Sequence, residues 1–182
     1  MIIASIDVGI LNLGFVVVHT CETDLQVSIL EMKKVNLTMN NCYSRDCELA
    51  HSKHIVDRVN HFIHDYKAVL DSADYILVER QPICGLTSVE ALLYNTYRHK
   101  TKLIHPVRVH KHFQFGRADY DARKVLSVHR AEELISTWTC QQKHIKYFEQ
   151  LKRKHDIADA ILFIQFFIKQ NLKSARQKAS IN

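Results

Sequence analysis

The sequence predicts a single α/β domain built on a mixed β-sheet. Three strand-like segments follow one another near the N-terminus, and helical and strand-like segments alternate after them. A chain of 182 residues, 47% of them hydrophobic and 24% charged, is long enough for one domain with a sizeable core. Its 4 glycines and 2 prolines favour long regular elements over elaborate loops. Meander strands followed by alternating helices and strands are typical of a mixed sheet flanked by helices.

The pattern of apolar residues predicts the bounds of each element. Residues 2–8 are mostly apolar, which is typical of a buried strand, and residues 25–35 alternate in part between apolar and polar side chains. An apolar stripe at helical spacing, which includes Ile55 and Val59, predicts a helix over 48–72. The other predicted elements are strands over 13–20, 75–79 and 103–109, a polar loop over 36–47, and helices over 88–100, 121–137 and 156–172.

The chain shows no repeat, linker or low-complexity tract, so we expect one domain over 1–173 and a polar, basic tail over 174–182. The first residues lack the basic segment of a signal peptide, and Asp7 interrupts their apolar run. The longest late apolar run, from Ala160 to Ile168, is too short to span a bilayer. We therefore expect a soluble, intracellular protein with no membrane partner.

Charge and cysteine content narrow the functional class. A formal net charge of +6, with 12 histidines in addition, favours an anionic partner such as nucleic acid, although an ordinary basic protein has the same balance. The 5 cysteines are odd in number and include no CxxC pair. Cys42 and Cys47 lie five positions apart without a second pair at zinc-site spacing, so we expect reduced thiols with a structural role.

The most informative residues are four carboxylates in apolar surroundings. Asp7 ends the first predicted strand and Glu79 ends the fourth, while Asp156 and Asp159 share one face at the head of the last helix. An ionised carboxylate in an apolar element is costly unless it is paired or binds a metal. If the first and fourth strands are parallel neighbours, Asp7 and Glu79 leave the sheet at the same edge. This set predicts a divalent-metal site that acts on a polyanion, because such ions prefer oxygen ligands and can activate water against a phosphodiester.

Each carboxylate also has an ordinary structural explanation. Asp7 precedes Gly9, and aspartate and glycine both favour turns. Asp156 and Asp159 would be stabilised at a helix N-terminus by the helix dipole alone. Glu79 has several arginines available for a structural ion pair, namely Arg80, Arg98 and Arg108.

Three short motifs resemble those of the RuvC-type Holliday-junction resolvases of the RNase H-like superfamily. Ile6-Asp7-Val8-Gly9, with Gly14 at the start of the second strand, resembles the first motif, and Val78-Glu79-Arg80-Gln81 resembles the second. His155-Asp156-Ile157-Ala158-Asp159-Ala160 resembles the third. The poxvirus Holliday-junction resolvases are similar to the chain also in length and in the residues around these motifs. The resemblance covers residues 1 to about 170.

This resemblance implies an RNase H-like fold, with a five-stranded mixed sheet flanked by helices, and a crossover junction endodeoxyribonuclease. It implies Mg²⁺ as the cofactor, with Mn²⁺ able to substitute and no small-molecule cofactor, bound by Asp7, Glu79, Asp156 and Asp159. It also implies a homodimer, with the helix over 88–100 in the interface, that acts on branched DNA. Paired nicks would then resolve viral DNA concatemers and recombination intermediates in the host cytoplasm.

The resemblance also implies basic residues near the active site. Lys124 is the first candidate for a catalytic cation and Arg123 the second, because a cation there would neutralise charge on the scissile phosphate. Lys111 is a candidate phosphate contact at the end of the fifth predicted strand. The run Lys152-Arg153-Lys154, just before the acidic helix, is a candidate contact to the DNA backbone. The loop Pro82-Ile83-Cys84-Gly85 departs from the bacterial pattern, which places an aromatic residue there.

Other functions remain compatible with parts of this pattern. A different RNase H-like nuclease, which cuts an RNA–DNA hybrid or simple branched DNA, would use the same metal cluster. An actin-like ATPase module also opens with Asp-x-Gly, but it needs a second lobe that 182 residues do not supply. A non-catalytic DNA-binding protein is disfavoured because all four carboxylates are present.

Overall fold

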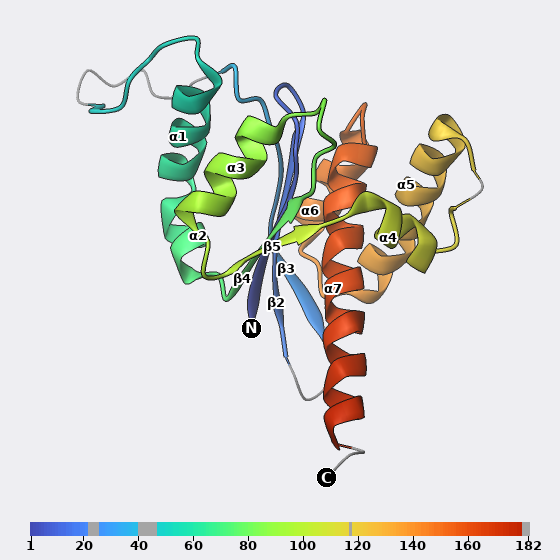
Figure 1. Ribbon diagram of the computed structural model, residues 1–182. Helices are drawn as coiled ribbons and strands as arrows, with labels where there is room; N and C mark the ends of the chain where they lie inside the picture. The colour runs from blue at the N-terminus through green and yellow to red at the C-terminus, as the bar shows by residue number, and fades with distance from the viewer. Residues whose placement is uncertain (22–25, 40–46, 117, 180–182) are drawn as a thin grey trace.

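The computed structural model describes residues 1–21, 26–39, 47–116 and 118–179, with side chains as far as residue 172. A five-stranded sheet forms its centre, in the order β3-β2-β1-β4-β5, and helices cover both faces (Figure 1). The strands are β1 (Ile2–Asp7), β2 (Leu13–Thr20), β3 (Val27–Val35), β4 (Tyr75–Glu79) and β5 (Thr101–Ile104). This arrangement confirms the predicted mixed sheet.

The register of the central strands determines where the carboxylates lie. β1 runs antiparallel to β2, with Asp7 opposite Gly14, and parallel to β4, with Ile6 opposite Val78. Because parallel neighbours end at the same edge of a sheet, the side chains of Asp7 and Glu79 leave β1 and β4 side by side. The central strands are apolar on both faces because helices cover both, as in other sheets with parallel crossovers.

The helices form two layers that bury opposite faces of the sheet (Figure 1). Successive residues of β1 alternate between the two cores, so that Ile3 belongs to one and Ala4 to the other. One layer contains α1 (Ile55–Asp65), α2 (Lys67–Ser72) and α3 (Thr87–Thr96). The other contains α4 (Pro106–His112), α5 (Tyr120–Thr137), α6 (Gln142–Gln150) and α7 (His155–Ala179).

Helix α7 is the central helix of the second layer. Nearly every side chain from Asp156 to Ile168 is buried, because the helix packs on β1, β2 and β3 as well as on α4 and α5. A helix that is apolar on most of its surface is expected in such a position. In the part of the chain that the structure describes, no helix is both long and apolar enough to cross a membrane.

Several predicted bounds were wrong. The predicted strand over 103–109 ends at Ile104, and Pro106 begins α4, because proline suits the first turn of a helix and lacks the N–H that a central strand donates. Lys111 therefore lies on α4 and not at a strand end. The predicted helix over 48–72 begins only at Ile55 and is divided at Tyr66, whose φ of −106° and ψ of 14° are not helical.

The predicted strands over 2–8 and 25–35 also differ slightly, since β1 ends at Asp7 and β3 begins at Val27. The remaining differences concern helices. The helix predicted over 88–100 ends at Thr96, and α6 was not predicted as an element. Helix α7 continues to Ala179 through most of the predicted tail, because residues 173–179 contain no glycine or proline to end it. The domain boundary at 173 stays a prediction.

Candidate active site

The four carboxylates meet in one cavity at the edge of the sheet. Asp7 and Glu79 come from the ends of β1 and β4, and Asp156 and Asp159 from the first turns of α7. All four line the same cavity of about 440 Å³. Residues from distant parts of the chain therefore lie in a single acidic cavity, as expected if β1 and β4 are parallel neighbours.

Gly14 allows α7 to approach the sheet closely enough for this arrangement. A Cβ atom on Gly14 would lie only 2.0 Å from the backbone oxygen of Asp156 and 3.3 Å from the Cβ of Asp7. No larger residue fits there without a shift of the backbone of α7. The start of α7 thus rests directly on β2, which holds Asp156 and Asp159 close to Asp7.

Burial and mutual repulsion make protonation of this cluster easier. Asp7 lies deep in the molecule with part of its side chain open to the cavity. Burial raises its pKa well above the usual range, and the charges of Asp159, Glu79 and Asp156 raise it further. Burial also raises the pKa of Asp159 to about 7, against a hydrogen bond from Ser127, while Glu79 adds to the rise.

Glu79 is oriented by hydrogen bonds from two neighbouring segments. Its Oε2 accepts a bond from the Val8 N–H at 3.2 Å and another from the side-chain amide of Gln81. The side-chain oxygen of Gln81, Oε1, in turn accepts a hydrogen bond from the Leu86 N–H at 3.1 Å. The backbone N–H of Gln81 donates to the Glu90 carboxylate. Burial raises the pKa of Glu79, and hydrogen bonds from Asp7, Val8 and Gln81 oppose the rise.

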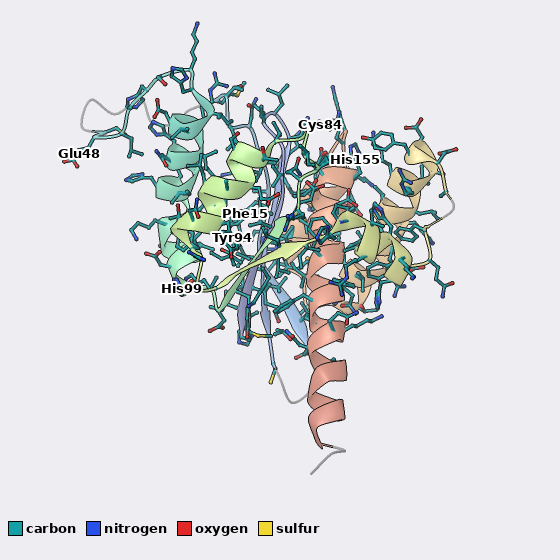
Figure 2. The ribbon with its side chains drawn as sticks, viewed as in Figure 1. Phe15, Glu48, Cys84, Tyr94, His99 and His155 are labelled. Carbon is teal, nitrogen blue, oxygen red and sulfur yellow. The ribbon has the colours of Figure 1, made fainter. Side chains whose placement is uncertain are left out.

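Asp156 has basic neighbours of its own. Arg153 Nε donates to its Oδ2 at 3.3 Å, and His155 Nε2 lies 3.3 Å from its Oδ1. Burial lowers the pKa of His155, against the charge of Asp156, so the imidazole is neutral at pH 7 and Arg153 is the charged partner. Figure 2 labels His155 at the start of α7, at the same end of the molecule as Cys84.

Three of the predicted basic residues line the acidic cavity, namely Arg123, Lys124 and Arg153. The first two lie near the start of α5, where the Asp119 carboxylate accepts a hydrogen bond from the Ala122 N–H and caps the helix. The Lys124 ammonium lies 3.9 Å from the centroid of the Tyr120 ring, and Arg123 donates to the backbone oxygen of Ala118 at 3.2 Å.

The other predicted basic residues lie outside the acidic cavity. Lys152 and Lys154 line an adjacent hollow together with Lys124, and Lys154 pairs with Glu132 at 3.0 Å. Lys111 is exposed on α4. The nucleic-acid contacts of all these residues stay predictions.

Sequence reasoning missed several residues that line or support the site. Gln81, His110, Tyr120 and Ser127 all line the cavity. Gln81 is the last residue of the second motif, Val78-Glu79-Arg80-Gln81, and this was the one signal for it in the sequence. The others lie on α4 and α5, whose packing against α7 no local pattern indicates.

The donor set of this site fits a hard divalent cation. Among the described residues, no lysine or arginine forms an ion pair with Asp7, Glu79 or Asp159. Clustered carboxylates whose charges repel one another, and that lack a basic partner, are the arrangement that an oxygen-preferring cation such as Mg²⁺ stabilises.

The strand order, together with acidic residues at the ends of β1 and β4 and at the head of α7, defines the RuvC type of RNase H-like fold. A sequence comparison identifies the group within this class. The chain belongs to the poxvirus A22 protein family, whose family model matches residues 1–170. No curated protein matches the sequence at a significant level.

Three solved structures illustrate the similarity of fold. The fowlpox virus resolvase in complex with substrate Holliday junction DNA has a TM-score of 0.69 at 18% identity, over 94% of this chain and 99% of that chain. The yeast mitochondrial Holliday junction resolvase Ydc2 has a TM-score of 0.65 at 18% identity, over 96% of this chain and 85% of that one. The Thermus thermophilus RuvC has a TM-score of 0.54 at 16% identity, over 94% and 97%.

Proposed function

We propose that this protein is a metal-dependent endonuclease that resolves four-way DNA junctions by paired, symmetric nicks. The observation that carries the proposal is the convergence of Asp7, Glu79, Asp156 and Asp159 in one cavity whose wall also includes Lys124. Membership of the poxvirus A22 family, and a fold shared with resolvases, support the same activity. Its biological role would be the resolution of viral DNA concatemers and recombination intermediates in the host cytoplasm.

The four carboxylates would hold the cation. When bound, Mg²⁺, or Mn²⁺ in its place, would activate water and stabilise the charge that develops on the phosphate. Because burial raises the pKa values of Asp7 and Asp159, these carboxyl groups would release their protons on binding the cation. Val8 and Gln81 keep Glu79 in a fixed orientation for the same purpose.

The basic residues at the cavity would act on the DNA. Lys124, on the wall of the cavity, would stabilise the negative charge on the phosphate oxygens as water attacks phosphorus in line. The bond to the 3′-oxygen breaks, which leaves a 5′-phosphate and a 3′-hydroxyl. Arg123 and Arg153, with the more distant Lys111, Lys152 and Lys154, would neutralise backbone charge. The exposed Ile83 lies in the loop next to Pro82, which lines the cavity.

Two coordinated nicks need two active sites, so we propose a homodimer with α3 in its interface. The two sites would cut two opposing strands of one junction. The formal net charge of +6 on each chain suits a large polyanionic substrate.

A different RNase H-like nuclease activity is the alternative, because the carboxylate cluster serves either substrate. The decisive experiment compares cleavage of a four-way junction, a linear duplex and an RNA–DNA hybrid, with and without Mg²⁺. We expect Mg²⁺-dependent nicks at symmetric positions in the junction and little cleavage of the other two substrates. Preferential cleavage of the hybrid would favour the alternative, and no cleavage of any substrate would indicate a non-catalytic DNA-binding protein.

A further inference from the structure

A second group of metal-ligand side chains lies away from the carboxylate cavity, where the segment before α1 approaches that helix. It consists of Cys47 and His51 from the segment and His61 from α1, and one donor atom of each lies within 4.8 Å of the others. Helices α1 and α7 lie on opposite sides of the sheet (Figure 1). Figure 2 labels Glu48, next to Cys47, far from His155 in the acidic cavity.

The buried imidazole of His61 has the hydrogen-bonding pattern of a metal ligand. The side chain is 2% exposed, and its Nε2 lies 3.2 Å from the carbonyl oxygen of Ala50. Since a carbonyl only accepts, Nε2 carries the hydrogen and donates it, which leaves a lone pair on Nδ1. That Nδ1 is buried and has no hydrogen-bond partner among the residues that the structure describes. Histidines that bind metals typically donate their other ring N–H to a backbone carbonyl in this way.

The two other side chains of the cluster lie beside His61. The exposed His51 ring packs beside the His61 ring, with 4.7 Å between centroids and 49° between planes. Cys47 is a free, half-buried thiol. One thiolate and two imidazoles favour zinc, a borderline-soft ion, over the hard Mg²⁺ that suits the carboxylate cavity.

We propose that Cys47, His51 and His61 bind one Zn²⁺ ion, with water as the fourth ligand. The ion would link the segment from Cys47 to His51 to helix α1 and stabilise their packing. The Cys47 thiol loses its proton to solvent as the zinc–sulfur bond forms. Bonds of about 2.0–2.1 Å to nitrogen and about 2.3 Å to sulfur require the donor atoms to move slightly closer together. His51 can move in this way because it lies at the surface.

The sequence alone does not indicate this site, because Cys47, His51 and His61 do not follow a common zinc-site spacing. His61 is ten positions beyond His51 and lies inside an amphipathic helix, where a histidine resembles any other core residue. The proposal is independent of the nuclease function, because none of its ligands lines the acidic cavity.

Cobalt provides a spectroscopic test on the full-length protein after treatment with a chelator. We expect Co²⁺ to produce a near-ultraviolet thiolate-to-cobalt charge-transfer band that saturates at one ion per chain and disappears when Zn²⁺ is added. Cobalt bound only by the carboxylates gives no such band, so Asp7→Asn should retain it. Zn²⁺ should also protect Cys47 from alkylation, as peptide mass spectrometry would measure.

Variants then identify the ligands. Cys47→Ser should abolish the band, and His51→Ala, a change at an exposed residue, should weaken Co²⁺ binding at least tenfold. Cys84→Ser and His64→Ala alter an exposed cysteine and an exposed histidine outside the cluster and should bind like the wild type. The absence of a band in the wild type, its persistence in Cys47→Ser, or unchanged binding in His51→Ala would each overturn the proposal.

Discussion

At the scale of single residues, the acidic cavity combines high proton affinity with a shortage of basic partners. Burial raises the pKa of Asp7, Glu79 and Asp159, and the repulsion among neighbouring carboxylates contributes to the rise for Asp7 and Asp159. Such residues are costly in the folded protein unless a cation or proton compensates. This cost in folding free energy indicates that the carboxylate cluster is present for function and does not stabilise the fold.

Neutral replacement of one carboxylate should separate cleavage from binding. We expect Asp7→Asn or Asp159→Asn to reduce junction cleavage by at least about 10²–10³-fold, since a charged group that acts on the transition state is lost. Junction binding should be unchanged or tighter, because less negative charge faces the phosphates. Cleavage assays and binding titrations measure both effects. Asp65→Asn, at an exposed position on α1, is the control and should behave like the wild type.

The raised pKa of Asp159 predicts how the stability of the metal-free protein depends on pH. The folded state binds this proton more tightly than the unfolded state, so stability falls as pH rises from about 4 towards about 7. A rise from the ordinary value of 3.8 to about 7 corresponds to a loss of at most about 4 kcal/mol. Urea denaturation in the presence of a chelator would measure this loss.

Asp159→Asn should show a smaller decrease over the same pH range, because its amide does not titrate. Addition of Mg²⁺ at pH 8 should stabilise the wild type more than the variant. Equal slopes of stability against pH in the two proteins would contradict the assignment of the raised pKa to Asp159.

Lys124 should affect the rate of cleavage more than affinity for DNA. A cation at the scissile phosphate matters most when charge builds up in the transition state, so Lys124→Ala should lower the single-turnover rate at saturating enzyme. A lysine that contacts the backbone elsewhere would weaken binding and reduce its salt dependence while the saturated rate stays unchanged. Lys111→Ala, at an exposed residue of α4, is the comparison variant. If Lys124→Ala leaves the saturated rate unchanged, Arg123 becomes the next candidate.

At the scale of secondary-structure elements, the contact between β2 and α7 determines whether the carboxylates meet. Gly14→Ala would place a methyl group 2.0 Å from the backbone oxygen of Asp156, so α7 must shift. We expect a loss of about 1–3 kcal/mol in the free energy of unfolding, as for other overpacked sites, together with a large loss of cleavage. Gly116→Ala has open space around its Cβ position and should retain activity and near-normal stability. Urea denaturation and cleavage assays on both variants test this contact.

The elements also differ in how well the sequence predicts them. Strands β1 and β4 were predictable because each is a short apolar run that ends on a carboxylate, and parallel pairing then brings Asp7 beside Glu79. Strand β5 was predicted too long because apolar residues beyond Ile104 suit a strand and a helix equally, and Pro106 decides in favour of the helix. Helix α6 has only nine residues, of which Ile145, Tyr147 and Phe148 are apolar, so the segment is too short for its pattern to predict a helix.

At both candidate sites, contacts between elements could not be predicted from the sequence. The hydrogen bonds of Gln81 to Glu79 and to the loop before α3 follow from tertiary packing. The gathering of Cys47, His51 and His61 depends on how the segment before α1 lies against that helix. No spacing rule along the chain contains this information.

At the scale of the whole molecule, the acidic cavity lies where β1 and β4 end. The layer that contains α3 covers the opposite face of the sheet from α7 (Figure 1). The described part of one chain contains one such carboxylate cluster, whereas resolution of a junction requires cuts in two strands. Helix α3 buries Val89 and Leu93 against the core and leaves Ala91 and Asn95 exposed. This exposed side of α3 is the surface that the proposed dimer would use.

We therefore expect light scattering to find a dimer at micromolar concentration. Ala91→Arg and Asn95→Arg should shift the protein towards monomer, because charges placed in an interface core lose their hydration without gaining partners. Gln150→Arg adds the same charge at an exposed position on α6 and should leave the dimer intact. The monomeric variants should still bind Mg²⁺, since the carboxylate site lies within one chain, but should lose coordinated cleavage and release singly nicked junctions. A wild-type monomer that nevertheless makes both cuts within one encounter with the junction would contradict the dimer.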